Sequence, residues 1–466
     1  MRRAPLAGGL LALACAPAPD PGAPTGAADD WSVVVVVLDA LPAGALGTYG
    51  RVVPGYEDVP VSPRIDAFAA DAVVFEDAYA SASYTQASTG SLFTGTSPAT
   101  HGVLGPHGNV LAPQHRTLAE TLAEAGFATA GLSCNPHVSR ESGFDQGFDL
   151  YRQYFFYEQG AHTVPETYVD DAATWWRGRA DERRFLYAHL LPPHQPYTPP
   201  APDDTAFGAD EVPVELGSTA FLVEASERRD LHADLPLMRD VRRRFDAGVR
   251  YADRQFGELL DALAGPDGDG LDDTVVVLLS DHGEGFAEHG AILHGGTVYP
   301  EMCRVPLVIA VPGLDGRREP GLVGTRDLGA TLAELFDLAW TDPGTADKGS
   351  SFLPLLVDDE AGRAARGTRR VLSRSMGNRP VWALRDEAWT LIHHKASDGV
   401  ELYDRTTDPG ETRNLAEARP DEAAALLDEL RRTLAADREA GRVYPRSVRE
   451  RLAHREALDA LGYFED

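Results

Sequence analysis

Lysine is almost absent from this chain of 466 residues, in which only Lys348 and Lys395 stand among 43 basic residues. The other basic residues are arginines, and 72 acidic residues bring the formal net charge to -29. A surface of that sign repels polyanions and lacks the clustered cations that a phosphate backbone needs. The composition therefore argues against nucleic acid as a partner.

Apolar runs long enough to span a membrane are also missing, although a shorter apolar stretch lies near the N-terminus. Arg2 and Arg3 precede the apolar residues 6–14, and Cys15 follows them. The stretch is too short for a permanent membrane helix but is typical of an export signal, and its end resembles a bacterial lipoprotein cleavage box. We predict a signal peptide over residues 1–15, with a plain secretory signal as the alternative. The protein is then exported, as a periplasmic or cell-surface lipoprotein or in secreted form, and its one expected membrane attachment is an N-terminal lipid anchor.

After this signal the chain divides into three segments that differ in composition and in predicted secondary structure. Residues 16–30 are rich in Ala, Pro, Gly and Asp and predict a flexible linker. Strand and helix signals alternate over residues 31–362, which predicts an α/β catalytic domain with a large doubly wound, mostly parallel sheet flanked by helices. Residues 363–466 predict a small antiparallel α+β subdomain. The remaining cysteines, Cys134 and Cys303, are expected as buried thiols, with a disulfide as the alternative.

The individual elements follow from periodicity and caps. Unbroken apolar runs, typical of strands buried on both faces, occupy residues 33–38, 185–191, 274–279 and 305–311. Helices are expected over 62–72, after the capping box that begins at Thr117, through 256–263, and over 421–440. Short antiparallel strands are expected at 381–384, 389–393 and 401–403.

Polar side chains follow the apolar runs, where ligands of parallel sheets collect. Asp39 ends the first run, His194 follows the second, and Asp281 and His282 follow the third. Two carboxylates and an imidazole favour a borderline dication, so Zn or Mn is expected over Ca or Mg. The sequence therefore predicts a metal site at this edge of the sheet.

A hydroxyl-rich segment, residues 83–95, is the candidate source of a nucleophile. It ends in Ser-Leu-Phe-Thr-Gly and is followed by Pro98 and His101. This order resembles the sulfatase family of the alkaline phosphatase superfamily, in which a CxPxR or SxPxR nucleophile motif precedes SLLTG, a Pro and a His-Gly. The resemblance places Thr85 at the nucleophile position.

The resemblance extends over nearly the whole chain after the linker. Further segments similar to motifs of the family are Leu38-Asp39 with residues 46–50, the PHxPY-like residues 193–197, Ser280 to Glu284, His294-Gly295, residues 304–307, residues 401–404 and the ending at 460–463. Their order and spacing identify the chain as a member of the family, and the fold expected from the resemblance is the alkaline-phosphatase or sulfatase type.

Departures from the family pattern change the expected chemistry. Sulfatases of the family carry a Cys or Ser that is oxidised to formylglycine, and Thr85 cannot be converted in that way. Ala87 replaces the Pro of the motif, Thr89 replaces its Arg, and Ala40 stands where a second Asp is common. The set of Asp39, Thr85, Asp281 and His282 instead resembles the single-metal site of phosphoryl-transfer relatives, which use a metal-bound Thr.

Roles for the site residues follow from this resemblance and from physical chemistry. A dication stabilises the alkoxide of Thr85, and the helix that begins there directs free N–H groups at anionic oxygens. His194 and His294 are expected to hold those oxygens or a second metal, and one of them to protonate the leaving group. Asn135 is a candidate for substrate contact, and Glu284 is expected to orient a ligand. We assign no catalytic role to five other histidines, which are expected to be structural or stay unassigned: His101, His189, His289, His393 and His394.

The function expected from the sequence is hydrolysis of a phosphate or phosphonate ester of a small molecule, glycan or lipid through a covalent phospho-Thr85. Three alternatives stay open: a sulfuric ester hydrolase, a phosphoethanolamine-type transferase, and an inactive lipoprotein that binds glycans or lipids.

Overall fold

An eight-stranded sheet forms the centre of the computed structural model, which describes residues 28–105, 109–154, 164, 166–228, 230–341, 348–358, 360–442 and 447–448. The strand order is β11-β2-β10-β7-β1-β6-β4-β5. These strands are β1 (Ser32–Asp39), β2 (Val73–Tyr79), β4 (Ala128–Ser133), β5 (Leu150–Gln153), β6 (Arg184–Pro193), β7 (Thr274–Ser280), β10 (Leu307–Ala310) and β11 (Arg317–Gly324). The predicted signal (1–15), most of the linker (16–30) and the ending at 460–463 lie outside the described residues.

Adjacent strands run parallel except at β10, which is antiparallel to both β7 and β2. The predicted doubly wound, mostly parallel sheet is confirmed. The grouping of run 305–311 with the other three was wrong, because this run forms the reversed strand and its carboxyl end lies at the opposite edge from those of β1, β6 and β7. A buried apolar run carries no signal of strand direction, so the sequence alone did not reveal the reversal.

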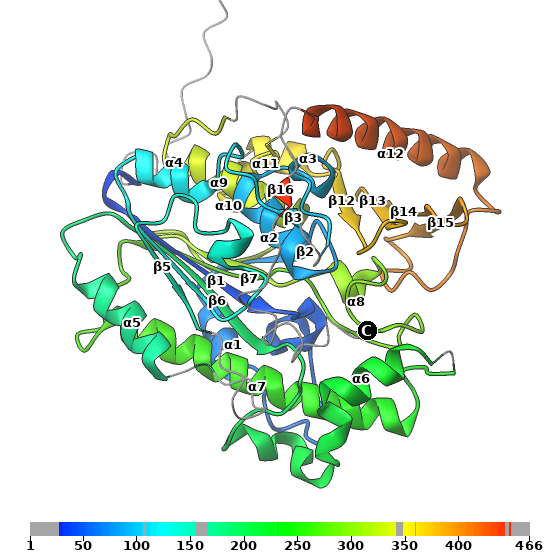
Figure 1. The fold of residues 1–466 in the computed structure, drawn as a ribbon, viewed down its shortest axis with the longest axis horizontal. Coiled ribbons are helices and arrows are strands. Elements are labelled where there is room, and N and C mark those ends of the chain that lie inside the picture. The colour runs from blue at the N-terminus through cyan, green and yellow to red at the C-terminus, as the bar shows by residue number, and fades with distance from the viewer. Residues whose placement is uncertain are drawn as a thin grey trace, which may run out of the picture.

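The alternation of side chains along β1 divides the core into two layers. Val34 and Val36 pack against α1, α5 and α7, while Val33, Val35 and Val37 pack against α2, α4 and α9. Figure 1 shows these two sets of helices on opposite faces of the sheet. The helices are α1 (Pro63–Ala70), α2 (Thr85–Thr94), α4 (Leu118–Glu124), α5 (Glu166–Arg177), α7 (Pro236–Ala264) and α9 (Leu328–Leu335). A sheet covered on both faces explains the unbroken valine run.

A second, four-stranded antiparallel sheet lies beside the large one (Figure 1). Its strands are β12 (Val371–Arg374), β13 (Val381–Arg385), β14 (Trp389–His394) and β15 (Gly399–Asp404), and α12 (Pro420–Gly441) covers it. The three predicted strands and the helix over 421–440 are confirmed. Strand β12 was not predicted.

Local signals located α1, α4 and α12 well. The capping box at Thr117 is present, since its hydroxyl accepts from Glu120 N and the Glu120 carboxylate accepts from Thr117 N. Helix α7 is much longer than the predicted 256–263 and begins at Pro236. The remaining short elements are α3 (Pro98–His101), α6 (Thr219–Ser226), α8 (Pro300–Cys303), α10 (Leu353–Leu356), α11 (Glu360–Ala365), β3 (Asn109–Val110), β8 (Gly285–Phe286), β9 (Ile292–Leu293) and β16 (Ser447–Val448).

Two further expectations concern single residues and membrane spans. Cys134 and Cys303 are free and buried, so the prediction of two thiols is confirmed. Among the helices that the structure describes, none has the length and apolar character to cross a membrane.

Candidate metal and nucleophile site

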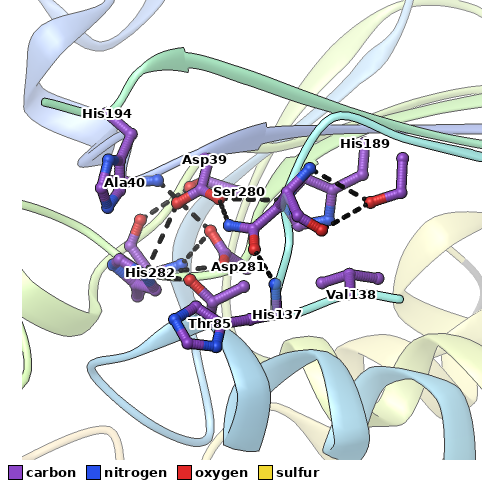
Figure 2. Close-up of polar contacts among 12 residues, drawn as sticks. Asp39, Ala40, Thr85, His137, Val138, His189, His194, Ser280, Asp281 and His282 are labelled. Atoms are coloured by element: carbon purple, nitrogen blue, oxygen red, sulfur yellow. Dashed lines mark hydrogen bonds and ion pairs between the residues drawn. The ribbon is translucent and has the colours of Figure 1, made fainter. Parts of the chain in front are cut away.

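Asp39, Asp281 and His282 meet at the carboxyl edge of the large sheet. Strands β1 and β7 are parallel neighbours with Leu38 opposite Ser280, so Asp39 and Asp281 leave the sheet side by side. All three side chains are buried. Figure 2 shows them facing one another, with Thr85 beside them. The strand register therefore produces the convergence that the sequence predicted.

One oxygen of the Asp39 carboxylate is saturated by protein partners. Oδ2 accepts from the side-chain amide of Asn135 and from Nε2 of His189, which lies 3.1 Å away. Nδ1 of His189 lies 2.8 Å from the hydroxyl of Tyr187, so both ring nitrogens are engaged. Oδ1 of Asp39 is buried and has no partner. These contacts orient Asp39 and leave one oxygen for a ligand.

The Asp281 carboxylate is arranged in the same way. Oδ1 accepts from Ala40 N at 3.3 Å and from His282 N at 2.9 Å, whereas the buried Oδ2 has no partner. Ala40 has a φ of 56°, a left-handed conformation that is strained for a residue with a Cβ. In this conformation the backbone N–H of Ala40 points at the Asp281 carboxylate. The second carboxylate thus also presents one free oxygen.

His282 completes the set with a nitrogen lone pair. Its Nδ1–H donates to Gly283 O at 2.9 Å, so Nε2 of the neutral ring is unprotonated. Nε2 lies 3.7 Å from Asp39 Oδ1 and 3.5 Å from Asp281 Oδ2. Two buried carboxylate oxygens without a hydrogen-bond partner among the described residues therefore lie close to Nε2 of His282. Buried polar atoms of this kind are rare without a ligand, and the donor set fits a borderline dication.

Thr85 is the first residue of α2 and faces this point. Its side chain is 1% exposed, and Oγ1 lies 3.1 Å from Nε2 of His282. Tyr84, at the N-cap, gives no side-chain cap, and the N-terminus of a helix favours anionic groups. The hydroxyl and the helix N-terminus thus point at one place.

His294 lies between His282 and His194. The ring centroids are 4.4 Å apart for His282 and His294, and 4.9 Å apart for His294 and His194. Nδ1 of His194 donates to Gln195 O at 2.8 Å, and its buried Nε2 has no partner. Nδ1 of His294 lies 3.1 Å from Oε1 of Glu284. The structure therefore brings both predicted histidines to the site and puts Glu284 against one of them.

Burial and charge act together on the acids of the site. Burial raises the pKa of Asp281, and the Asp39 carboxylate raises it further. Burial also raises the pKa of Asp39, but the hydrogen bond from His189 and the charge of His194 outweigh it, so this pKa falls below its usual range. The two acids therefore differ, because two adjacent buried carboxylates do not both hold a charge easily. A dication between them removes that repulsion.

The side chains of His194 and His294 are neutral at pH 7. Burial lowers the pKa of His194 to about 4, and it lowers the pKa of His294 to about 3 with the help of the neighbouring His282. Because Nδ1 of His194 carries the proton, its Nε2 presents a lone pair. A neutral ring in this tautomer accepts a proton or binds a cation, and it does not act as an acid until it has taken up a proton.

Two histidines of the cluster were not assigned by the sequence. His189, left as structural or unassigned, has a ring nitrogen within 4.8 Å of ligand oxygens of Asp39 and Asp281. No sequence pattern marks His137, which Figure 2 draws in the same cluster, where its backbone N–H donates to Oδ1 of Asn135. His189 lies within β6 and His137 lies in the turn after β4, and both strands end at this edge, so the carboxyl-end rule applied to every buried histidine in or just after a strand would have found them.

Asn135, the candidate for substrate contact, lies at the site against Asp39. Its Nδ2 donates to Asp39, and its Oδ1 accepts from His137 N at 2.6 Å. The amide is thus engaged at both ends within the protein. Its present contacts fit orientation of Asp39.

The small sheet holds the segment that leads to the nucleophile. The backbone of Arg374 donates to Ser81 O and accepts from Ser83 N, both at 3.0 Å. The buried guanidinium of Arg374 donates to the hydroxyl of Tyr84 at 2.7 Å. Since Tyr84 immediately precedes Thr85, the end of β12 clamps the start of α2.

Comparison with known proteins gives two matching family models. A model described as Sulfatase matches residues 32–338, and a model described as N-sulphoglucosamine sulphohydrolase, C-terminal, matches residues 288–440. The chain is 32% identical over 187 residues to choline-sulfatase of Rhizobium meliloti, covering 39% of this chain and 34% of that protein. It is 25% identical over 430 residues to YidJ, an uncharacterized sulfatase of Escherichia coli, covering 80% and 83%. The chain thus spans about a third of the choline-sulfatase and most of YidJ.

Solved structures share the fold. The crystal structure of the phosphonate monoester hydrolase of Agrobacterium radiobacter superposes with a TM-score of 0.68 at 19% identity, covering 88% of this chain and 96% of that one. At this identity the likeness concerns the fold, which agrees with the large mixed sheet flanked by helices.

Proposed function

The chain belongs to the sulfatase family, and we propose that it is a metal-dependent hydrolase of phosphate or phosphonate esters that uses Thr85 as its nucleophile. The observation that carries the proposal is the convergence of Asp39 Oδ1, Asp281 Oδ2 and His282 Nε2 next to the hydroxyl of Thr85. Asp39 Oδ1 and Asp281 Oδ2 have no hydrogen-bond partner among the described residues, and His282 Nε2 lies 3.1 Å from the Thr85 hydroxyl. The other polar atom of each of these three side chains is held by the protein.

Asp39, Asp281, His282 and Thr85 would hold one divalent cation, with Zn or Mn favoured by the mixed nitrogen and oxygen donors. Bound there, the cation supplies positive charge that stabilises the Thr85 alkoxide and the anionic substrate oxygens. That local charge is needed, because the protein as a whole carries a net charge of -29.

In the proposed reaction the Thr85 oxygen forms a bond to phosphorus, and the bond from phosphorus to the leaving oxygen breaks. The N–H groups at the start of α2 bind the remaining phosphoryl oxygens. Water then attacks the phospho-Thr85, and phosphate leaves with regeneration of the hydroxyl. In the first step the neutral pair of His194 and His294 takes up the proton of the Thr85 hydroxyl and passes it to the departing alkoxide. In the second step His194 Nε2, which has no hydrogen-bond partner among the described residues, accepts a proton from the attacking water, and this proton returns to the Thr85 oxygen.

Phosphorus esters are preferred over sulfate esters because of the nucleophile itself. Threonine cannot be converted to formylglycine, so a sulfated intermediate would have to be released by attack of water and not by elimination. A sulfuric ester hydrolase remains the second candidate, because choline-sulfatase is among the relatives and the family models are those of sulfatases. The proposed substrates are small-molecule, glycan or lipid esters. We also propose that the protein is exported through the signal over residues 1–15. N-terminal sequencing of the mature protein tests this export.

The test combines a substrate panel with trapping of the intermediate. Aryl phosphate, phosphodiester, phosphonate and sulfate esters are compared with the wild type and Thr85→Val, which keeps the branched shape and removes the hydroxyl. We expect hydrolysis of a phosphorus ester to fall by at least about 10³-fold in Thr85→Val, and acid-quenched wild-type enzyme to carry one phosphoryl group on Thr85 in a peptide mass spectrum. Near-normal turnover by Thr85→Val would exclude this nucleophile, and faster hydrolysis of aryl sulfate than of every phosphorus ester would reverse the substrate preference.

A further inference from the structure

A cavity of about 830 Å³ lies apart from the catalytic residues. It opens between the turn η2 (Ala43–Ala45), the first turns of α7, strand β8 and helix α8. None of Asp39, Thr85, Asp281 or His282 lines it. We call it the arginine cavity, after its most frequent charged residue.

The arginine cavity concentrates positive charge in a strongly acidic protein. Its guanidinium groups belong to Arg51, Arg239, Arg242, Arg243 and Arg304. The acids that line it number four: Asp240, Asp246, Glu288 and Glu301. A local excess of cations is unusual where the whole chain has a net charge of -29, so these arginines are gathered against the general trend.

Two of the arginines are neutralised by acids of the wall. Arg51 forms a bidentate pair with the buried Asp246. Arg242 lies 3.6 Å from Asp246 and 3.5 Å from Glu288. These pairs build the wall and leave little charge for a ligand.

Two of the other three arginines have no acidic partner among the described residues. Arg304 donates to the backbone carbonyl of Glu76, which is a neutral partner. Arg239 is exposed, and its side chain makes no hydrogen bond or ion pair with the described residues. Arg243 forms an ion pair with Asp240 at 3.7 Å. The fourth acid, Glu301, is held by His289 at 2.9 Å and does not reduce this excess.

The floor of the cavity is apolar. Val53, Met238 and Phe286 line it and are otherwise buried. The guanidinium of Arg242 lies 4.4 Å from the ring centroid of Phe286, so charge and aromatic surface are in direct contact. Helix α7 also begins here at Pro236 with no side-chain cap, and its N-terminus favours negative charge. An anionic group at the lip and an apolar body on the floor would satisfy both surfaces.

We propose that the arginine cavity is a second binding site, separate from the catalytic one, for an organic anion that carries its carboxylate, sulfate or phosphate group on an apolar body. Arg239 and Arg243 bind the anionic group, and Phe286 and Met238 receive the body. The site does not depend on the reaction at Thr85.

Fluorescence titration of the full-length protein with anilinonaphthalene sulfonate tests this proposal, with the uncharged parent phenylnaphthylamine as the comparison probe. Replacing the two proposed anion-binding arginines, Arg239→Glu with Arg243→Glu, should weaken sulfonate binding by at least about 10-fold, while the uncharged probe binds the two proteins alike. A second variant, Gly44→Phe, adds a ring at a wall position where a new Cβ meets nothing within 4 Å, and should block both probes.

The matched control carries the same change of net charge on α12, as Arg432→Glu with Arg438→Glu, and should bind the sulfonate as the wild type does. Thr85→Val should also bind it normally. Unchanged sulfonate binding in the Arg239 and Arg243 double variant would overturn the proposal, as would equal wild-type affinity for the charged and uncharged probes. Loss of binding in Thr85→Val would place the probe in the catalytic site and overturn it as well.

Discussion

The two sheets of the molecule contribute to one site by different means. The large sheet supplies the candidate metal ligands directly, because Asp39 and Asp281 extend from adjacent parallel strands in register. The small sheet supplies no ligand atom among the described residues and instead binds the loops that carry Thr85 and His294. Beyond β12, Met376 N donates to Gly295 O at 2.7 Å, next to His294. Ligand placement thus belongs to one region and loop placement to the other.

The largest effect is expected from the large sheet. Asp281→Asn keeps the shape of the side chain but removes the charge of Oδ2, so we expect bound metal to be lost and turnover to fall by about 10³-fold or more. Metal analysis of the purified variant and steady-state kinetics measure both quantities. Asp273→Asn, at the opposite end of the same strand and exposed, is the control and should match the wild type. Full metal content in Asp281→Asn would contradict the proposal that the large sheet supplies the metal ligands.

A smaller effect, of a different kind, is expected from the small sheet. Arg374→Met removes the hydrogen bond to Tyr84 and leaves every candidate metal ligand in place, so kcat should fall by about 10 to 100-fold at unchanged metal content. Arg374→Lys should restore part of the rate. Arg370→Met, at an exposed position just before β12, serves as the control. Loss of metal together with rate in Arg374→Met would show that the two sheets do not divide the work in this way.

The smallest effect concerns a residue that joins the two regions. Nδ1 of His289 lies 2.9 Å from Glu301, and Nε2 lies 3.0 Å from the backbone oxygen of Glu411. Burial lowers the pKa of His289, but the hydrogen bond to Glu301 and its charge outweigh this and raise the pKa to about 9. Because the folded-state pKa is raised, the charged histidine contributes stability that is present in full below about pH 6.5 and is lost as the pH rises through about 9.

We therefore expect His289→Gln to lower the free energy of unfolding by about 1 kcal/mol at pH 6 and by less at pH 10. Urea denaturation of wild type and variant at both pH values measures the difference, and the exposed His232→Gln is the control. A difference that grew with pH would contradict the sign of this linkage.

The sequence predicted the parts of the site that adjacency and strand ends specify. Asp281 and His282 are neighbours in the chain after a buried strand, and Asp39 ends another, so their meeting required nothing beyond a parallel pairing of the two strands. Thr85 came from resemblance, since a hydroxyl in a polar segment has no pattern of its own. The link from Arg374 to Tyr84 joins residues 290 positions apart, and no local pattern announces such a contact.

By itself, then, the sequence determined the alternation of strands and helices, the two buried faces of β1 and the set of candidate ligands, because these depend on local periodicity and on the ends of apolar runs. Only the tertiary structure decided the reversal of β10, the engagement of His189 and Asn135 with Asp39, and the one oxygen that each carboxylate leaves free. Hydrogen bonds between distant strands made those choices, since each depends on which strands pair and in what register.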